Sequence, residues 1–323
     1  MRICVYGAGA IGGHLAVRLG RVPGNRVQVV ARGVHLAAIR ERGLTLRFKD
    51  TPLHARVEAS DDIRAMPPPD VVIVTLKAHS IARAADDLAA LARGGARMAF
   101  VINGIPWWYP AAAIPPLSAQ ARNRIDPARL ADRFDLTRVA GGVVYSPNTI
   151  VEPGVIHCAA DYTRLIFGPV RTGHDGAAAE VAALFAAAGV TSTCVHDLRP
   201  EIFGKLLRNS GLNPLGALTG STSPEVTSDP VLRQFCVDIL REVVAVAGSQ
   251  GVPLPVDEDM LDPSRLAPHK ASMAQDLAAG RPLEIDGILG NVQALAREGG
   301  IATPALDLVT ALLLARVRAD DAR

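Results

Sequence analysis

Residues 1–20 read MRICVYGAGAIGGHLAVRLG, and this stretch decides how the amino-terminal part of the chain is expected to fold. The apolar run Ile3 to Tyr6 has the composition of a buried strand, and His14 to Leu19 has that of a helix. The pattern G-x-G-x-x-G occupies residues 7–12 between them. A turn of this kind opens a helix whose free N–H groups attract phosphate. The stretch therefore predicts a dinucleotide-binding turn, and an ordinary glycine-rich turn is the alternative.

Each glycine of the pattern has its own physical task. Gly7 permits the tight turn, Gly9 lets the backbone approach a pyrophosphate, and Gly12 lets the helix pack closely on the strand. Gly13 stands directly behind them. The residues expected to contact a dinucleotide in this turn are Gly7, Ala8, Gly9, Ala10, Ile11 and Gly12.

The bulk composition restricts the class of protein. A chain of 323 residues, 49% of them hydrophobic, is long enough for about two domains and a sizeable core. Its 34 Lys and Arg residues nearly balance its 32 Asp and Glu residues, which argues against a nucleic-acid or membrane-surface partner. The longest apolar stretches, VVIVTL and LVTALLLARV, are too short to span a bilayer.

The cysteines are scattered, and no two of them form a C-x-x-C pair. Such cysteines are expected to be reduced and mostly packed in the interior of a cytoplasmic protein, and no signal peptide is expected before the first strand. No spacing of His, Cys and carboxylate residues is typical of a metal site, so we expect no bound metal. The cysteines are Cys4, Cys158, Cys194 and Cys236.

Strands and helices alternate over the first part of the chain, which predicts an α/β fold with a doubly wound parallel sheet of the Rossmann type. The run Val71 to Leu76 is continuous and apolar, as in strands covered on both faces. The expected strands span 3–6, 27–31, 71–76, 98–102, 141–146, 154–157 and 164–167, with a short one near Thr193. The expected helices span 14–19, 34–42, 80–91 and 177–188.

The pattern changes near Val195 to Leu198. Beyond this point the apolar residues follow helical periodicity, and Gly or Pro separates the helical segments. We therefore expect a nucleotide-binding domain over residues 1–196 and an all-α domain over residues 197–323. The expected helices of the second domain span 201–211, 230–250, 263–279, 283–298 and 305–319.

The end of the second expected strand indicates which dinucleotide binds. NAD-binding folds place an acidic residue there to hold the ribose 2′-hydroxyl. This chain has Ala31 and Arg32 instead, and no acidic residue follows until Glu41. Arginine suits a 2′-phosphate by its charge and its forked donors, so Arg32 predicts NADP(H), with a solvated surface arginine as the alternative. Lys77, after the third strand, is a further candidate for contact with the cofactor.

Candidate catalytic residues occur in the helical part, first in EIFGKLLRNSGLNPL. Lys205, Asn209 and Asn213 are spaced i, i+4 and i+8, so they follow one face of a helix. Asn is a poor helix former, and two of them on one stripe need a reason. They form either a polar strip that faces a cleft or a solvated face that ends in a turn before Pro214.

A second polar stretch reads HKASMAQDLAAGRPLEIDG. Gly280 is expected to end one helix and Pro282 to begin the next. Ser272 then lies on the first helix, and Glu284 lies in the first turn of the second. Taken alone, Glu284 is explained by helix capping, because a carboxylate is stabilised at the start of a helix.

Together these motifs resemble the ketopantoate reductase (2-dehydropantoate 2-reductase) family over nearly the whole chain. The K-x-x-x-N-x-x-x-N-P motif and the S-M-x-Q-D motif are far more specific than the glycine pattern, because their order and spacing together are unlikely to arise by chance. The matching elements are GAGAIG at 7–12, Arg32, TLK at 75–77, NG at 103–104, the lysine motif at 205–214, and S-M-x-Q-D from Ser272 with E-I-D from Glu284.

The resemblance implies an NADPH-dependent reduction of a 2-oxo acid to a D-2-hydroxy acid. Lys205 resembles the general acid that protonates the developing alkoxide, and Asn103 resembles the residue beside the nicotinamide and the substrate. Glu284 resembles the acid that completes the site, by contact with Lys205, the substrate or the ribose.

The same resemblance implies the substrate-binding groups. Asn209 and Asn213 resemble residues that bind the substrate hydroxyl and orient the substrate, and Ser272 resembles the residue that holds its carboxylate. One segment departs from the family pattern, because the link after Asn103 is long and contains Trp107 and Trp108 followed by a tyrosine. It is either local packing that anchors a Pro-rich loop or a pocket wall that changes which 2-oxo acid fits.

Three hypotheses about function remain at this point. The first is reduction of 2-dehydropantoate to D-pantoate in the synthesis of pantothenate and coenzyme A. The second is reduction of another branched 2-oxo acid by the same fold, and the third is a non-catalytic NADP(H)-binding protein. The apolar last helix, LDLVTALLLARV, either packs internally or forms part of a homodimer face.

Overall fold

The structure is a computed structural model that describes residues 1–48, 51–160, 162–268 and 270–321. The chain divides into two compact units. The first comprises Met1–Ile102 and Arg129–Leu198, and the second comprises Asn103–Ala128 and Arg199–Arg323. The boundary expected after residue 196 lies close to the division between Leu198 and Arg199. The sequence analysis did not assign the segment 103–128 to the second unit.

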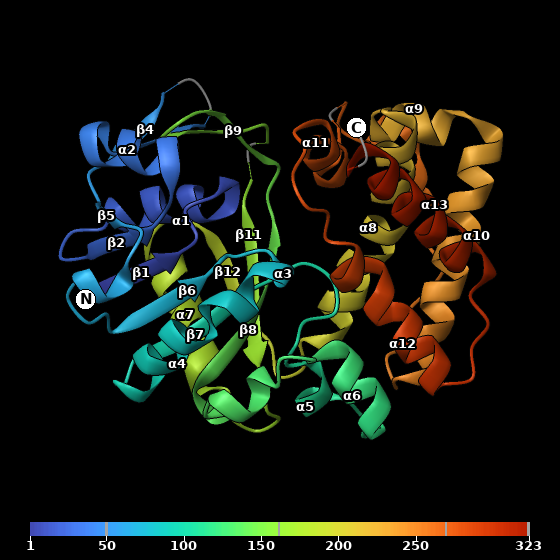
Figure 1. The fold of residues 1–323 in the computed structure, drawn as a ribbon, viewed down its shortest axis with the longest axis horizontal. Helices are drawn as coiled ribbons and strands as arrows, with labels where there is room; N and C mark the ends of the chain where they lie inside the picture. The colour runs from blue at the N-terminus through green and yellow to red at the C-terminus, as the bar shows by residue number, and fades with distance from the viewer. Residues whose placement is uncertain (49–50, 161, 269, 322–323) are drawn as a thin grey trace. The chain divides into compact units, whose positions relative to one another are not determined.

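The first unit contains, within its described residues, an eight-stranded sheet of order β12-β11-β8-β7-β6-β1-β2-β5 (Figure 1). Its neighbouring strands are parallel except β8 and β11, which are antiparallel. This topology confirms the expected Rossmann-type α/β class. The strands are β1 (Arg2–Tyr6), β2 (Arg26–Val30), β5 (Glu58–Ser60), β6 (Val71–Val74), β7 (Arg97–Val101), β8 (Val139–Tyr145), β11 (Arg164–Pro169) and β12 (Thr191–Cys194).

Helices cover this sheet and bury its apolar side chains. The α1 helix packs on β1 and β2, and α7 packs on β8, β11 and β12. Val5, Leu15 and Ile73 are among the fully buried residues that form the core of the unit. The helices are α1 (Ala10–Gly20), α2 (Gly33–Arg42), α3 (Ala78–Ile81), α4 (Ala85–Arg93) and α7 (Gly176–Ala187), with short 3₁₀ turns at 63–65, 82–84, 130–133 and 136–138.

A second sheet of the same unit has the order β4-β3-β10-β9 within the described residues. Only β10 corresponds to a strand expected from the sequence. The others were missed because they are short, and β9 is largely exposed and so lacks an apolar pattern. The strands are β3 (Leu44–Arg47), β4 (Leu53–Ala55), β9 (Asn148–Glu152) and β10 (Val155–Cys158). The α1 helix packs against this sheet as well.

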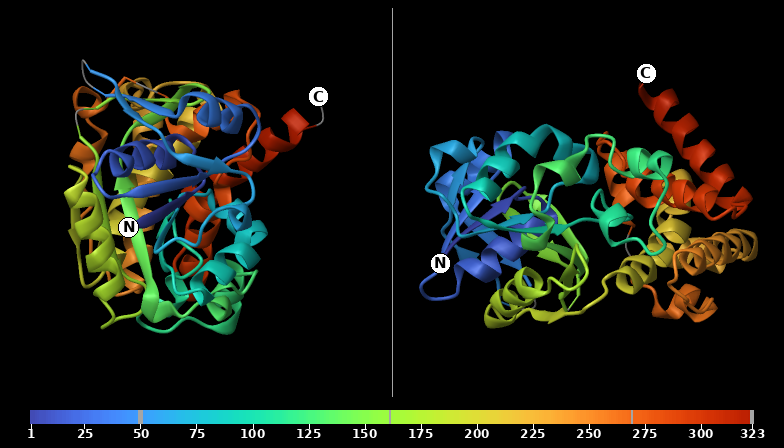
Figure 2. Two further views of the ribbon diagram at one scale, coloured as in Figure 1. Left: turned by 90° about the vertical axis from the view of Figure 1, so that its left-hand side faces the viewer. Right: turned by 90° about the horizontal axis from the view of Figure 1, so that it is seen from below.

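The second unit is helical, as expected, and is built around α8 (Arg199–Thr219). The helices α10, α11 and α13 all pack on α8. In the right-hand view of Figure 2, the carboxyl-terminal end of α13 extends beyond the other helices of its unit. The remaining helices are α5 (Tyr109–Ala112), α6 (Ala119–Ile125), α9 (Ser223–Ser228), α10 (Pro230–Ser249), α11 (Ser272–Ala278), α12 (Asn291–Glu298) and α13 (Pro304–Asp321), with 3₁₀ turns at 258–261 and 263–265 and a π-helix, η7 (Asp286–Gly290).

Three expectations for the helical part were wrong in detail. The helix expected over 263–279 is a 3₁₀ turn followed by α11, because two prolines and polar residues interrupt the pattern before Ser272. The helix expected over 283–298 begins as a π-helix at Asp286. The turn considered before Pro214 is absent from the described chain, since α8 continues through this proline to Thr219.

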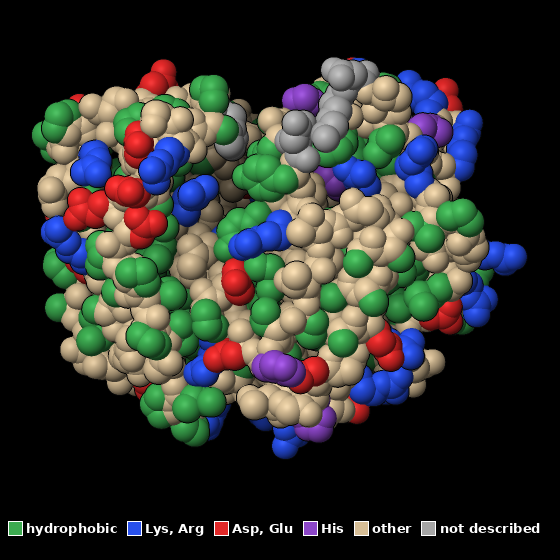
Figure 3. All heavy atoms as spheres, turned by 180° about the vertical axis from the view of Figure 1, so that it is seen from behind, with side chains coloured by type: hydrophobic (Ala, Val, Ile, Leu, Met, Phe, Trp, Pro, Cys, Tyr) green, Lys and Arg blue, Asp and Glu red, His purple; other side chains and the backbone are tan. Residues whose placement is uncertain are grey.

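No helix within the described residues has the length and apolar character needed to cross a membrane. On the face that Figure 3 shows, basic and acidic side chains are interspersed over both units. This agrees with the near balance of charge in the sequence.

The first prediction concerns the glycines of the amino-terminal turn. A Cβ on Gly12 would overlap the carbonyl oxygen of Gly7 and the Thr75 hydroxyl, whereas a Cβ on Gly9 would have no heavy atom within 4 Å. Gly12→Ala should therefore lower the stability of the first unit by roughly 1–3 kcal/mol or more, the usual cost of overpacking. Gly9→Ala is the matched control and should melt like the parent protein. Thermal unfolding of the two variants measures the difference, and equal melting temperatures would contradict the packing argument.

Candidate functional site

Three expected cofactor-binding segments lie at one edge of the large sheet, at the carboxyl ends of parallel strands. The glycine-rich turn follows β1, Arg32 follows β2 and Lys77 follows β6. Arg32 is exposed and directly precedes α2, and Lys77 directly precedes α3. Ligands of doubly wound sheets bind at this edge.

The glycine-rich turn has the features that a dinucleotide phosphate requires. Gly7 has a φ of +105°, which favours glycine, and its carbonyl accepts a hydrogen bond of 2.6 Å from Thr75 Oγ1. The backbone at Gly9 is open, because a Cβ there would meet nothing within 4 Å. The first turn of α1 contains no acidic residue, so no side-chain charge there repels a phosphate at the helix start. The residues present therefore fit the group that the fold implies.

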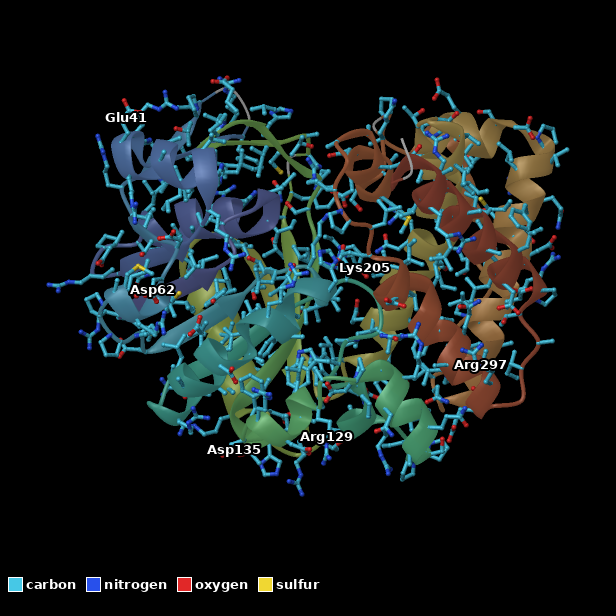
Figure 4. All side chains as sticks on the ribbon, viewed as in Figure 1. Glu41, Asp62, Arg129, Asp135, Lys205 and Arg297 are labelled. Carbon is cyan, nitrogen blue, oxygen red and sulfur yellow. The ribbon has the colours of Figure 1, made fainter. Side chains whose placement is uncertain are left out.

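In the second unit, three side chains from distant parts of the chain form a hydrogen-bonded series. Lys205, which is labelled in Figure 4, lies on α8. Its Nζ donates to Asn103 Oδ1 at 2.6 Å. Asn103 Nδ2 in turn donates to Glu284 Oε2 at 3.4 Å. The amide of Asn103 thus connects an ammonium group to a carboxylate. Its oxygen accepts from the ammonium group, and its nitrogen donates to the carboxylate.

The environment of Lys205 makes its amine easier to deprotonate. Burial lowers the pKa of Lys205 to about 8, and the negative charge of Glu284 acts in the opposite direction. Because the pKa falls below its ordinary value, desolvation outweighs the attraction of the carboxylate. An amine with this pKa can donate a proton near neutral pH, and its charge stabilises an oxygen that becomes negative.

The position of Asn103 depends on a close contact between two backbone segments. Gly104 has a φ of +76°, and a Cβ on it would overlap the carbonyl group of Gly287 in η7. The N–H of Ile105 donates to the Gly287 carbonyl at 2.8 Å, and Asn291 Nδ2 donates to the Ile105 carbonyl at 2.8 Å. The segment that carries Asn103 is therefore fixed against the π-helix.

The sequence analysis did not identify Gly287 or Asn291 as site-forming residues. Their contacts join segments more than 180 positions apart, and Asn291 by itself reads as one polar residue in a helix. The placement of Glu284 also differs from the expectation. Glu284 lies just before the helix rather than in its first turn, and its carbonyl accepts from the N–H of Ile288. Its carboxylate accepts a hydrogen bond from Asn103 Nδ2.

The two further asparagines of α8 continue the face that carries Lys205. Within the described chain, neither the Asn209 amide nor the Asn213 amide hydrogen-bonds to another residue, although Asn213 is only 7% exposed. Ser272 is exposed at the start of α11, which packs on α8. Amide groups of this kind can pair with the hydroxyl and carbonyl groups of a polar ligand.

The aromatic segment after Asn103 is buried. Trp107, Trp108 and Tyr109 are 6%, 2% and 0% exposed, and the Tyr109 ring meets Phe203 of α8 edge to face at 6.0 Å between centroids. The segment is also partly helical, since it contains α5 and α6. The aromatic residues are therefore packed in the interior of the second unit.

Metal chemistry was not expected, and the described residues contain no group of three or more His, Cys, Asp or Glu side chains that could hold a metal ion.

Comparisons with known proteins cover the whole chain. The family model described as "Ketopantoate reductase PanE/ApbA" matches residues 3–172, and the model of its carboxyl-terminal domain matches residues 197–317. A 2-dehydropantoate 2-reductase from Mesorhizobium japonicum is 35% identical over 316 residues, which is 97% of each chain. A relative of the same name from Halobacterium salinarum is 27% identical over 315 residues, or 95% of each chain.

Solved structures share the fold. A candidate ketopantoate reductase from Ralstonia solanacearum superposes with a TM-score of 0.88 at 32% identity and covers 98% of both chains. A D-mandelate dehydrogenase, solved with NADH and anilino(oxo)acetate, superposes with a TM-score of 0.85 at 21% identity over 99% of both chains. The second likeness is informative about the fold alone.

The second prediction concerns the titration of Lys205. Because the chain contains only Lys49, Lys77, Lys205 and Lys270, lysine-specific isotope labelling gives a simple NMR spectrum in which this amine can be followed. We expect a pKa of about 8 for Lys205. Glu284→Gln should lower this pKa further, because it removes the negative charge that favours the ammonium form. Glu298→Gln is the control and should leave it unchanged, and a Lys205 pKa near 10 in the parent protein would contradict the burial argument.

Proposed function

Because the chain belongs to the ketopantoate reductase family, we propose that it reduces 2-dehydropantoate to D-pantoate with NADPH as the reductant. Membership of this family makes it an oxidoreductase that uses a pyridine nucleotide. The observation that carries the proposal is the series Lys205–Asn103–Glu284, in which a lysine of lowered pKa is held by an amide. A cytoplasmic location and a place in pantothenate and coenzyme A synthesis belong to the same proposal.

Lys205 supplies the proton in the proposed reaction. Bound NADPH would deliver a hydride to the carbonyl carbon of the substrate, which leaves negative charge on the carbonyl oxygen. The ammonium group of Lys205 stabilises this charge and then protonates the oxygen, which gives the hydroxyl of the product. Asn103 holds the amine in place through its Oδ1 atom. Glu284 keeps the amide oriented and favours the protonated form of the lysine.

The remaining polar groups would bind the substrate. Asn209 and Asn213 present amides along the same face of α8 that have no hydrogen-bond partner among the described residues, and such amides can pair with hydroxyl and carbonyl groups. The exposed hydroxyl of Ser272 would donate to the substrate carboxylate. This set of donors suits a small 2-oxo acid with a hydroxyl group.

The third prediction tests the activity. Loss of NADPH absorbance should be fastest with 2-dehydropantoate when it is compared with pyruvate and with other branched 2-oxo acids. Lys205→Ala should lose about 10²- to 10⁴-fold in kcat, the usual contribution of a general acid, while NADPH still binds. The parent rate should fall as pH rises through about 8, because Lys205 then loses the proton it must donate.

Lys270→Ala is the matched control, since Lys270 is an exposed lysine of the same unit. It should keep the parental rate. Fast turnover of another branched acid, with slow turnover of 2-dehydropantoate, would support the second hypothesis and retain the mechanism. NADPH binding without turnover of any 2-oxo acid would support a non-catalytic protein, and normal turnover by Lys205→Ala would rule out the proposed proton donor.

The fourth prediction concerns the choice of cofactor. Arg32→Ala should raise the KM for NADPH about tenfold, because one charged hydrogen-bonding partner of the 2′-phosphate is lost. The KM for NADH should change little, since NADH has a hydroxyl at that position. Arg26→Ala is the control, because Arg26 is exposed at the opposite end of the same strand β2. Equal use of both cofactors by the parent protein would contradict the role of Arg32.

A homodimer is part of the proposal as well. Leu308 and Leu312 are 54% and 47% exposed on α13, and they lie one helical turn apart. An apolar face of this kind suits a contact with a second copy of the chain.

A further inference from the structure

His35 uses both nitrogens of its ring to join three segments of the first unit. It lies in the first turn of α2 and is partly buried. Its Nε2 lies 2.7 Å from the carbonyl oxygen of Ala8, in the glycine-rich turn. Its Nδ1 accepts a hydrogen bond of 3.1 Å from the N–H of Gly154, between β9 and β10.

The two partners determine the protonation state of the ring. A backbone N–H can only donate, so Nδ1 carries no proton, and a carbonyl oxygen can only accept, so Nε2 carries one. The ring that satisfies both contacts is the neutral tautomer protonated at Nε2. Partial burial agrees with this state because it lowers the pKa of His35, although the contact with Ala8 acts in the other direction.

The contact with Ala8 restrains the centre of the turn that would receive the pyrophosphate. The N–H of Ala8 donates to the Val30 carbonyl at 3.0 Å, and the N–H of Gly9 donates to the Gly7 carbonyl at 2.8 Å. Without His35, the Ala8 carbonyl would lose the side-chain donor that fixes its direction. The planar peptide group between Ala8 and Gly9 is thus held at both ends. Helix α1 begins at the next residue, Ala10. The orientation of the Ala8–Gly9 peptide therefore sets the direction of the free N–H groups at the start of α1.

The other end of the link is itself anchored. The carbonyl of Gly154 accepts from the N–H of Thr45 in β3 at 2.9 Å. Gly154 has a φ of +81°, and a Cβ on it would lie 3.4 Å from the Cβ of Ala38 in α2. His35 therefore links the glycine-rich turn to the four-stranded sheet through Gly154.

We propose that His35 is a positioning residue of the dinucleotide site, which holds the Ala8 peptide in the orientation that binds the pyrophosphate. This role rests on the proposed function, since it requires that the protein bind a dinucleotide. His35 also lies one turn along α2 from Arg32, the candidate ligand of the 2′-phosphate. One side chain thus connects the two phosphate-binding segments of the first unit.

Three substitutions separate the two hydrogen bonds. His35→Gln places an amide nitrogen near the position of Nε2 and keeps a donor for Ala8. His35→Asn places an amide oxygen near Nδ1 and keeps the acceptor for Gly154, but it loses the donor. His35→Phe keeps the ring and loses both contacts. The measurement is the NADPH dissociation constant from a fluorescence titration well below the melting temperature, together with KM for NADPH, KM for the 2-oxo acid, and kcat.

We expect His35→Asn and His35→Phe to weaken NADPH binding about five- to tenfold, as for the loss of one hydrogen bond, and to raise KM for NADPH with kcat unchanged. His35→Gln should bind NADPH almost as the parent does. His157→Ala is the matched control, because His157 is an exposed histidine on β10. This substitution should change neither the NADPH dissociation constant nor the KM for NADPH.

Thermal unfolding distinguishes positioning from general stability. If all three His35 variants melt earlier but bind NADPH as the parent does, the residue is structural and the inference is wrong. Equal weakening by His35→Gln and His35→Asn would also overturn it, because the Ala8 contact would then not be responsible. If the parent protein binds no dinucleotide, the proposed function itself fails, and this result is distinct from the other two.

Discussion

The backbone contact between Gly104 and Gly287 is the constraint on which the candidate catalytic centre depends. Gly104 leaves no room for an ordinary side chain, since a Cβ on it would overlap the Gly287 carbonyl. The contact brings Asn103 to the segment that follows Glu284, and Lys205 then completes the series from α8. Two residues without side chains therefore allow three functional side chains from distant parts of the sequence to meet. The close approach of the two backbone segments is what places Asn103 within hydrogen-bonding distance of both Lys205 and Glu284.

The electrostatic balance at Lys205 follows from this arrangement. Burial favours the neutral amine, and Glu284 favours the ammonium form, so the pKa reflects the difference between the two effects. Asn103 stands between the charges and contacts both. The Asn103 amide accepts from the amine and donates to the carboxylate, so it helps to hold both groups in place.

Periodicity predicted those parts of the fold in which local pattern and tertiary role agree. The β1 and β6 strands follow from continuous apolar runs, and the glycine-rich turn and the polar face of α8 follow from residue spacing. The short strands β3, β4 and β9 could not be predicted, since few residues carry their pattern. The helical segment 103–128 read as a Pro-rich loop, and its attachment to the second unit depends on contacts with residues near the end of the chain. The π-helix that begins at Asp286 has no signature in the periodicity of the sequence.

The attachment of the segment 103–128 shows which forces hold the candidate site together. Arg124 pairs with Asp286 at 2.6 Å, but the side chains are 44% and 78% exposed, so the pair contributes at most about 1 kcal/mol. Trp107, Trp108 and Tyr109 are almost completely buried, and each large side chain contributes roughly 1.5–3 kcal/mol by burial. The Trp108 Nε1 atom has no hydrogen-bond partner among the described residues, a cost of about 1–3 kcal/mol that offsets part of this gain. Even so, the burial of the aromatic side chains contributes more to the free energy of folding than the Arg124–Asp286 ion pair does. The tryptophans, which begin four residues after Asn103, therefore act on the site by holding the backbone that carries it.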